Sequence, residues 1–132
     1  MKYLFCMAVI VMATIFVANK ANAHEMVPTY PKLEPSFMDG LHKTTMTMFN
    51  KRPEVEYYEI GVFTKNWDPI PFVSNYKIYK IPYLSTVSFD IYVRDEDKSK
   101  VTYICSKSKL RTTRSATRTA VSSRICSKVK GN

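Results

Sequence analysis

Two cysteines have the most distinctive chemical setting in this chain of 132 residues. Cys105 and Cys126 lie in near-copies of one hexapeptide, ICSKSK at residues 104–109 and ICSKVK at residues 125–130. Two thiols without neighbouring His or Cys ligands cannot complete a tetrahedral zinc site, and a redox-active pair is normally much closer in sequence. In an exported protein the pattern therefore predicts a structural disulfide between Cys105 and Cys126.

The first 23 residues predict that the chain is exported. Lys2 precedes an uncharged apolar run over residues 3–17, and the Ala-Asn-Ala at residues 21–23 fits a signal-peptidase cleavage site. The run is short for a transmembrane helix, and no second one follows. We expect a signal peptide over residues 1–23, one mature domain over residues 24–132 and no membrane span after cleavage. The expected compartment is the periplasm of a Gram-negative bacterium, or otherwise the extracellular space.

Cleavage after Ala23 makes His24 the mature N-terminus, which suggests a second chemistry. An N-terminal His offers its α-amine and its imidazole to one copper ion, and His42, the only other histidine, can supply a third nitrogen. Met26 and Met38 are candidate soft ligands. The competing interpretation is that His24 stands at this position by chance and that His42 is simply exposed, in which case the protein needs no cofactor.

No residue pattern typical of an enzyme accompanies these candidates. The acidic residues are scattered, without the pairing that acid–base catalysis requires. The chain has no Gly-x-Ser-x-Gly motif and no phosphate-binding glycine loop, and it contains three glycines in all. We therefore expect a non-enzymatic protein.

A period of two in the hydrophobic pattern predicts that strands position the cysteines. At residues 85–94, Val87, Phe89, Ile91 and Val93 alternate with polar or exposed side chains, which is typical of a strand with one buried face. Similar strand character recurs at residues 27–33, 43–49, 56–63, 75–81, 100–107 and 120–130. The prolines in residues 27–33 predict that this segment is an edge strand. The pattern predicts an all-β fold, an immunoglobulin-like antiparallel β-sandwich of about seven strands.

The register of the last two strands predicts where the disulfide lies. Ile104 points away from Cys105, and Val121, Ile125 and Val129 point away from Cys126. With the isoleucine and valine side chains in the core, both cysteines lie on the outer face. The bridge then closes the polar loop at residues 108–119 at its base, which contributes roughly 3 kcal/mol to stability. Residues 95–99 predict a charged hairpin loop before these strands.

Charge is distributed unevenly along the expected mature chain. Residues 24–97 contain eight basic and eleven acidic residues, whereas residues 98–132 contain ten basic residues and no acidic one. Such a segment is either a solvated face or a surface that binds an anionic partner. The basic side chains that we single out are Lys107, Lys109, Arg111, Arg114 and Arg118. Because aromatic residues are not interleaved with them, we expect no specific nucleic-acid binding.

Residues 44–50, which end in Asn50, and residues 87–94 carry a resemblance to a known family. They resemble strands of the N-terminal immunoglobulin-like domain of periplasmic pilus chaperones, the PapD-like family. Between these two segments, residues 56–64 are similar to a further strand of that domain and residues 67–71 to the turn after it. One branch of this family closes a long loop between its last two strands with a disulfide. Cys105 and Cys126 match that arrangement.

The resemblance implies a protein partner. Such chaperones hold an unfolded pilus subunit by adding their last strand to its incomplete β-sheet. It implies that Val121, Ile125 and Val129 contact the partner, beside the basic residues named above. The family has two domains, whereas the expected mature chain has room for one. The alternatives are a periplasmic copper-binding sandwich that uses His24 and His42, and a surface or adhesion protein that binds anions through its basic tail.

Overall fold

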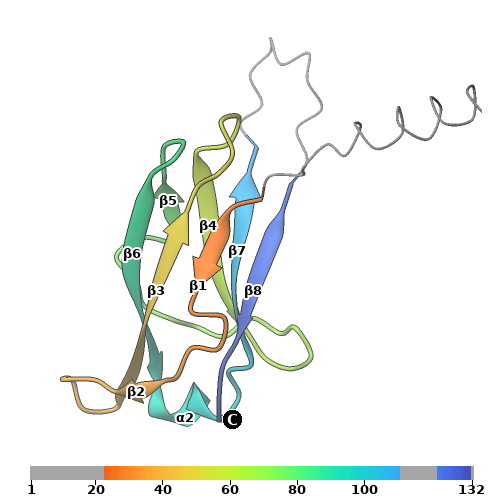
Figure 1. Ribbon diagram of the computed structural model, residues 1–132. Coiled ribbons are helices and arrows are strands. Elements are labelled where there is room, and N and C mark those ends of the chain that lie inside the picture. Colours follow the sequence, from red (N-terminus) through yellow and green to blue (C-terminus); the bar gives the residue numbers. More distant parts are fainter. Residues whose placement is uncertain (1–22, 111–121, 132) are drawn as a thin grey trace, which may run out of the picture.

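The structure is a computed structural model that describes residues 23–110 and 122–131. Two four-stranded antiparallel sheets form a sandwich (Figure 1). In the first sheet, β3 (Leu41–Phe49) pairs on one side with β1 (Glu25–Val27) and β2 (Glu34–Pro35), and on the other side with β6 (Thr86–Arg94). The second sheet has the order β5 (Ile78–Lys80), β4 (Tyr57–Phe63), β7 (Tyr103–Lys109), β8 (Arg124–Lys128). The predicted all-β antiparallel sandwich is confirmed.

Alternating side chains of the long strands fill the space between the sheets. Met46 and Met48 of β3 are fully buried, and in the register of the sheet they lie opposite Phe89 and Val87 of β6. From the facing sheet, β4 contributes buried side chains at every second position. Burial of each large apolar side chain is worth roughly 1.5–3 kcal/mol relative to exposure. The period-two pattern read from the sequence therefore identifies the core face of these strands.

The N-terminal segment contacts both sheets. β1 pairs antiparallel with β3, which places Met26 opposite Met48 in the core. After Pro28 the chain changes sheets, and the carbonyls of Thr29 and Pro31 accept hydrogen bonds from the N–H groups of Lys128 (3.0 Å) and Lys130 (2.8 Å). The single edge strand that the sequence predicts over residues 27–33 is thus wrong in its bounds. Regular pairing with β3 ends at Val27, because a proline follows that has no N–H group to donate.

The connection from β6 to β7 also differs from the prediction. The sequence predicts a hairpin loop at residues 95–99, but Asp95–Lys98 forms a one-turn helix, α2. β6 and β7 belong to different sheets, so the chain crosses between the layers here. Three acidic residues in the first turn suit a helix N-terminus, and the buried Asp97 carboxylate is paired with Arg94 (2.8 Å) and Lys100 (3.2 Å).

Some sequence-based predictions lie outside the described residues. They include the signal peptide up to residue 22, most of the predicted loop at residues 108–119, and the candidate residues Arg111, Arg114, Arg118 and Val121. Within the described ranges, no helix is both long and apolar enough to span a membrane.

Candidate functional site

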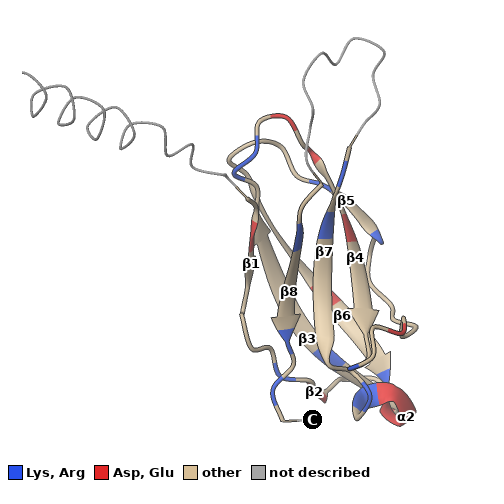
Figure 2. Cartoon of the chain, turned by 90° about the vertical axis from the view of Figure 1, so that its right-hand side faces the viewer, with Lys and Arg blue, Asp and Glu red and all other residues tan. Residues whose placement is uncertain are grey.

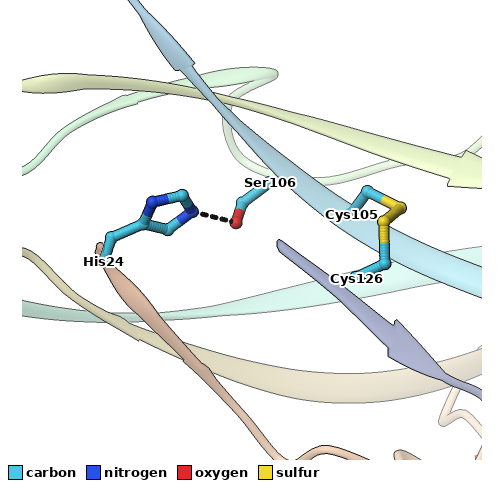
Figure 3. The surroundings of a disulfide bond; sticks show 4 residues. All are labelled: His24, Cys105, Ser106 and Cys126. Carbon is cyan, nitrogen blue, oxygen red and sulfur yellow. Dashed lines mark hydrogen bonds between the residues drawn. A yellow bond between two sulfur atoms is a disulfide. The ribbon is translucent and has the colours of Figure 1, made fainter. Parts of the chain in front are cut away.

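The disulfide joins β7 and β8 as the sequence predicts. Cys105 lies directly opposite Cys126 in the antiparallel register, and the two sulfurs are bonded. Ile104 is buried in the core, and Ile125 packs against it from β8, so the bridge lies on the outer side of the sheet. Figure 3 shows the disulfide and the His24 side chain on opposite sides of β7. The disulfide therefore links β8 covalently to β7 on the outer face of the sheet.

β8 has an edge that is only partly paired. Ser123 accepts a backbone hydrogen bond from Ser108, and the Val129 N–H donates to Thr102, both at 2.9 Å. In an antiparallel strand, the N–H and C=O groups of successive residues point to alternate sides within the sheet. The backbone groups of the odd-numbered residues of β8 therefore point toward β7, and those of the even-numbered residues point away from β7. Of these outward groups, Lys128 and Lys130 bond the N-terminal segment.

The outward backbone groups nearer the start of β8 form no backbone hydrogen bonds within the described residues, although β1 lies next to β8. β8 is the last strand of its sheet, and among the described residues no backbone pairs with the outer side of Ser122, Arg124 or Cys126. We call this stretch, residues 122–126, the open edge. It lies directly after residues 111–121 in the chain. An unpaired strand edge can add a strand from another chain.

His24 is buried on the inner side of the same strands. Its Nε2 lies 2.6 Å from Ser106 Oγ, and its Nδ1 lies 3.3 Å from Ser123 Oγ, with the ring packed against Tyr58 at 4.5 Å between centroids. Burial, followed by the nearby positive charge of Arg52, lowers the pKa of His24 to about 4, against the opposing effect of its bond to Ser106. His24 is therefore a neutral core residue that ties β1 to β7 and β8.

A network of polar side chains surrounds this histidine at the same end of the sandwich. The guanidinium of Arg52 donates to Ser123 Oγ (3.1 Å) and to Glu54 (2.7 Å). The Ser123 N–H donates to Ser108 Oγ at 2.7 Å. Every buried side-chain nitrogen and oxygen of the described residues has a partner, so the network is a satisfied structural unit.

The two histidines of the predicted copper site lie at opposite ends of the first sheet. His24 precedes Glu25, which pairs with Phe49. His42 lies seven residues further back on β3, roughly 23 Å away at about 3.3 Å per residue, and its ring bonds Asp95 at 2.5 Å. One ion cannot bind both rings, so the copper site built on this pair has no geometric basis. Among the described residues, no group of three or more His, Cys, Asp or Glu is placed to hold a metal.

The candidate partner-binding side chains on β8 face the core. Val129 is buried, and Ile125 is partly buried in the hydrophobic cluster. They are inner-face residues of the sandwich, so a partner strand beside β8 meets its backbone and the residues of its outer face. The prediction that these side chains fill a partner's pockets is therefore not supported by their orientation in the free chain.

Three of the described basic residues of the tail lie on the outer face of the second sheet. Lys107 and Lys109 of β7 and Arg124 of β8 point outward, and Figure 2 shows the basic segments along these two strands. Lys107 lies opposite Arg124 in the register, whereas Lys109 is paired with Glu59 of β4 at 2.7 Å.

Comparison with known proteins identifies the fold but no sequence family. No protein-family model matches the chain, and no curated protein matches it. The structure is similar to the crystal structure of the E. coli chaperone DraB, with a TM-score of 0.59 and 17% sequence identity, covering 81% of this chain and 53% of that chaperone. The chain thus has a chaperone-like immunoglobulin fold and spans about half the length of that protein.

Proposed function

We propose that this chain is an exported, non-enzymatic binding protein that takes up a β-strand of a protein partner along the open edge of β8. The observation that carries the proposal is the outer side of residues 122–126, where the backbone groups of a sheet edge have no hydrogen-bonded strand in the described part of the chain. Strand addition supplies the missing hydrogen bonds from another protein. A disulfide in the same strand is consistent with an oxidising compartment such as the periplasm.

The likeness to DraB supports this proposal at the level of the fold. That protein is a chaperone, and pilus chaperones are the family that the sequence resembles. A partner with an incomplete β-sheet, such as an unfolded pilus subunit, is the occupant that the resemblance suggests. The open edge is short, and each backbone hydrogen bond contributes only about 0.5–1.5 kcal/mol net. Tight binding therefore requires side-chain contacts in addition to strand pairing.

The proposal is tested by separating the backbone of β8 from its side chains. Arg124→Pro removes an outward N–H from the open edge, while the inward hydrogen bonds of Ser123 and Val129 to β7 remain. Arg124→Ala removes the same side chain but keeps the N–H group. A photo-crosslinking residue at Ser122 is introduced into each variant, and the exported protein is crosslinked in cells; the same residue at Thr45, exposed on the other sheet, is the control.

We expect a discrete protein adduct from position 122 and none from position 45. The adduct should persist in Arg124→Ala and fall at least fivefold in Arg124→Pro, with both variants as folded as the parent by circular dichroism. Equal adducts from positions 45 and 122, or an adduct unaffected by the proline, would show that the open edge is not the binding site.

A further inference from the structure

A second feature of the molecule, on the outer face of the second sheet, is independent of the open edge. In the register of β4, β7 and β8, Phe63 lies opposite Tyr103, and Tyr103 lies opposite Lys128. Four positions further along the strands, Glu59, Lys107 and Arg124 form a parallel row. The disulfide lies between these rows, opposite Gly61. One end of the face is thus aromatic and the other is charged.

The aromatic end presents a flat ring to solvent. Trp67, in the turn after β4, stacks on Tyr103 with ring centroids 4.4 Å apart and planes inclined by 5°. Trp67 as a whole residue is still 49% exposed although Tyr103 covers one face of its indole, which leaves the opposite face as the one that can meet solvent. Its backbone φ is +67°, a conformation that bulky residues seldom adopt. The turn therefore holds the tryptophan over the sheet.

Phe63 connects this platform to the charged end. Its ring lies over Gly61, where an added Cβ would come within 2.7 Å of it, and it lies 6.1 Å from Trp67 between centroids. The guanidinium of Arg124 is placed over the same ring at 5.7 Å. A shallow pocket opens beside it, lined by Glu59, Gly61, Phe63, Cys105, Lys107 and Arg124. The Phe63 ring thus lies between the indole of Trp67 and the pocket, where Lys107 and Arg124 place two positive charges.

The charge of this face favours an anionic ligand. Glu59 is the acidic residue among the lining residues, and it is paired with Lys109. Lys107 and Arg124 have no acidic partner within ion-pair distance among the described residues. A guanidinium binds a carboxylate through two parallel hydrogen bonds, and an open aromatic face takes up an apolar ring surface. The ligand should therefore combine a flat apolar face with a carboxylate a short distance away.

We infer that this face binds an acidic oligosaccharide, with one sugar ring stacked on Trp67 and a carboxylate of a neighbouring sugar held by Arg124 and Lys107. A uronic-acid chain has both features, because each pyranose ring has a C–H face and a carboxylate at its edge. A single-stranded nucleic acid fits less well. It stacks successive bases on successive rings, whereas this face offers one open stacking position in the described structure.

The test uses the full-length mature chain and oligogalacturonate of four to six residues, with the neutral maltohexaose for comparison. Trp67 is the only tryptophan, so a stacked sugar changes the intrinsic fluorescence directly. At 150 mM salt we expect a saturable change with the acidic oligosaccharide and at least tenfold weaker binding of the neutral one. By calorimetry, Trp67→Ala and Arg124→Gln should each weaken binding at least tenfold. Lys43→Gln, which removes a lysine from the outer face of the other sheet, should leave it unchanged.

Other results overturn the inference. Binding that Arg124→Gln abolishes but Trp67→Ala leaves intact would be charge attraction alone. Equal affinity for the neutral sugar would exclude an acidic ligand, and tighter binding of an oligonucleotide of equal charge would assign the face to nucleic acid. In contrast, the inference itself expects Arg124→Ala to lose saccharide binding while the crosslink from position 122 is retained, because this site and the open edge are separate.

Discussion

The imidazole of His24 is enclosed by the hydroxyls of Ser106 in β7 and of Ser123, directly before β8, and by the Tyr58 ring. A neutral imidazole has one donor and one acceptor nitrogen, and a hydroxyl can serve as either, so the network needs no proton. Protonation would place a second positive charge near Arg52 in a buried site. The pKa of His24 accordingly falls from 6.5 to about 4.

This shift predicts how stability depends on pH. Between pH 6.5 and 4 the unfolded chain binds a proton at His24 that the folded chain does not, so the stabilisation is fully present above pH 6.5 and is lost as pH falls toward 4. We expect up to about 3 kcal/mol from this residue. Urea unfolding of the parent and of His24→Gln at pH 7 and pH 4.5 measures it. The variant should show a clearly smaller loss on acidification, and an equal loss in both would contradict the prediction.

Asn50 is a second fully buried polar residue, and it joins three segments of the chain. Its Nδ2 donates to the carbonyls of Val55 (2.6 Å) and Ile81 (2.8 Å). Its Oδ1 accepts from the Arg52 N–H (2.8 Å) and from the Tyr58 hydroxyl (2.6 Å). Burial raises the pKa of Tyr58 to about 12, so that hydroxyl remains a donor at neutral pH.

Replacement of Asn50 should therefore be costly. Asn50→Ala leaves several buried groups without partners, each costing about 1–3 kcal/mol before relaxation. We expect a total loss of about 3 kcal/mol in the free energy of unfolding, measured by urea denaturation. Asn66→Ala, at an exposed turn, is the matched control and should change stability by less than about 1 kcal/mol. A similar small effect at both positions would show that the Asn50 network is not a major source of stability.

At the scale of elements, the paired strands β7 and β8 depend on the disulfide. The cysteines are separated by 21 positions in sequence, and closing a loop of this size reduces the entropy of the unfolded chain. The double variant Cys105→Ser, Cys126→Ser should lose about 3 kcal/mol in urea unfolding. The parent in reducing agent should lose the same amount. An unchanged midpoint in both would mean that the bridge does not constrain the unfolded state.

The elements that the sequence predicts well are those with a sustained period of two. β3 and β6 alternate over nine residues each, and the inner face of β6 is the predicted one. β5, with three residues, is much shorter than the predicted strand at residues 75–81. Alternation alone cannot set the ends of a strand, because pairing depends on where the neighbouring strand stops. The same limit explains α2, whose role as a crossover depends on which sheet each flanking strand joins.

The candidate sites were harder to predict for a similar reason. The disulfide follows from two residues and their register, and it is confirmed. Ser106 and Ser108 share the inward face with Ile104, and buried hydroxyls require partners, but nothing in the sequence indicates that His24 supplies one. Trp67 and Tyr103 are far apart in sequence, and only the pairing of β4 with β7 brings the turn over Tyr103.

At the scale of the whole molecule, the N-terminal segment holds the two sheets together. Met26 is buried between them from β1, while the carbonyls of Thr29 and Pro31 bond β8. His24 extends the same connection to the inner face of β7. A destabilising substitution in this segment should therefore lower the stability of both sheets, as expected of one cooperative unit.

Met26→Ala tests whether residues 24–132 unfold as one domain. Removal of a buried methionine side chain should cost about 2–5 kcal/mol. In urea, Trp67 fluorescence reports the second sheet, and hydrogen exchange of β6 amides reports the first. Both transitions should move to lower urea by the same amount, because a cooperative unit has one midpoint for all probes. Phe37→Ala, at a side chain that is 83% exposed, should move neither. A shift in β6 with the Trp67 transition unmoved would show that the sheets unfold separately and that the N-terminal segment does not couple them.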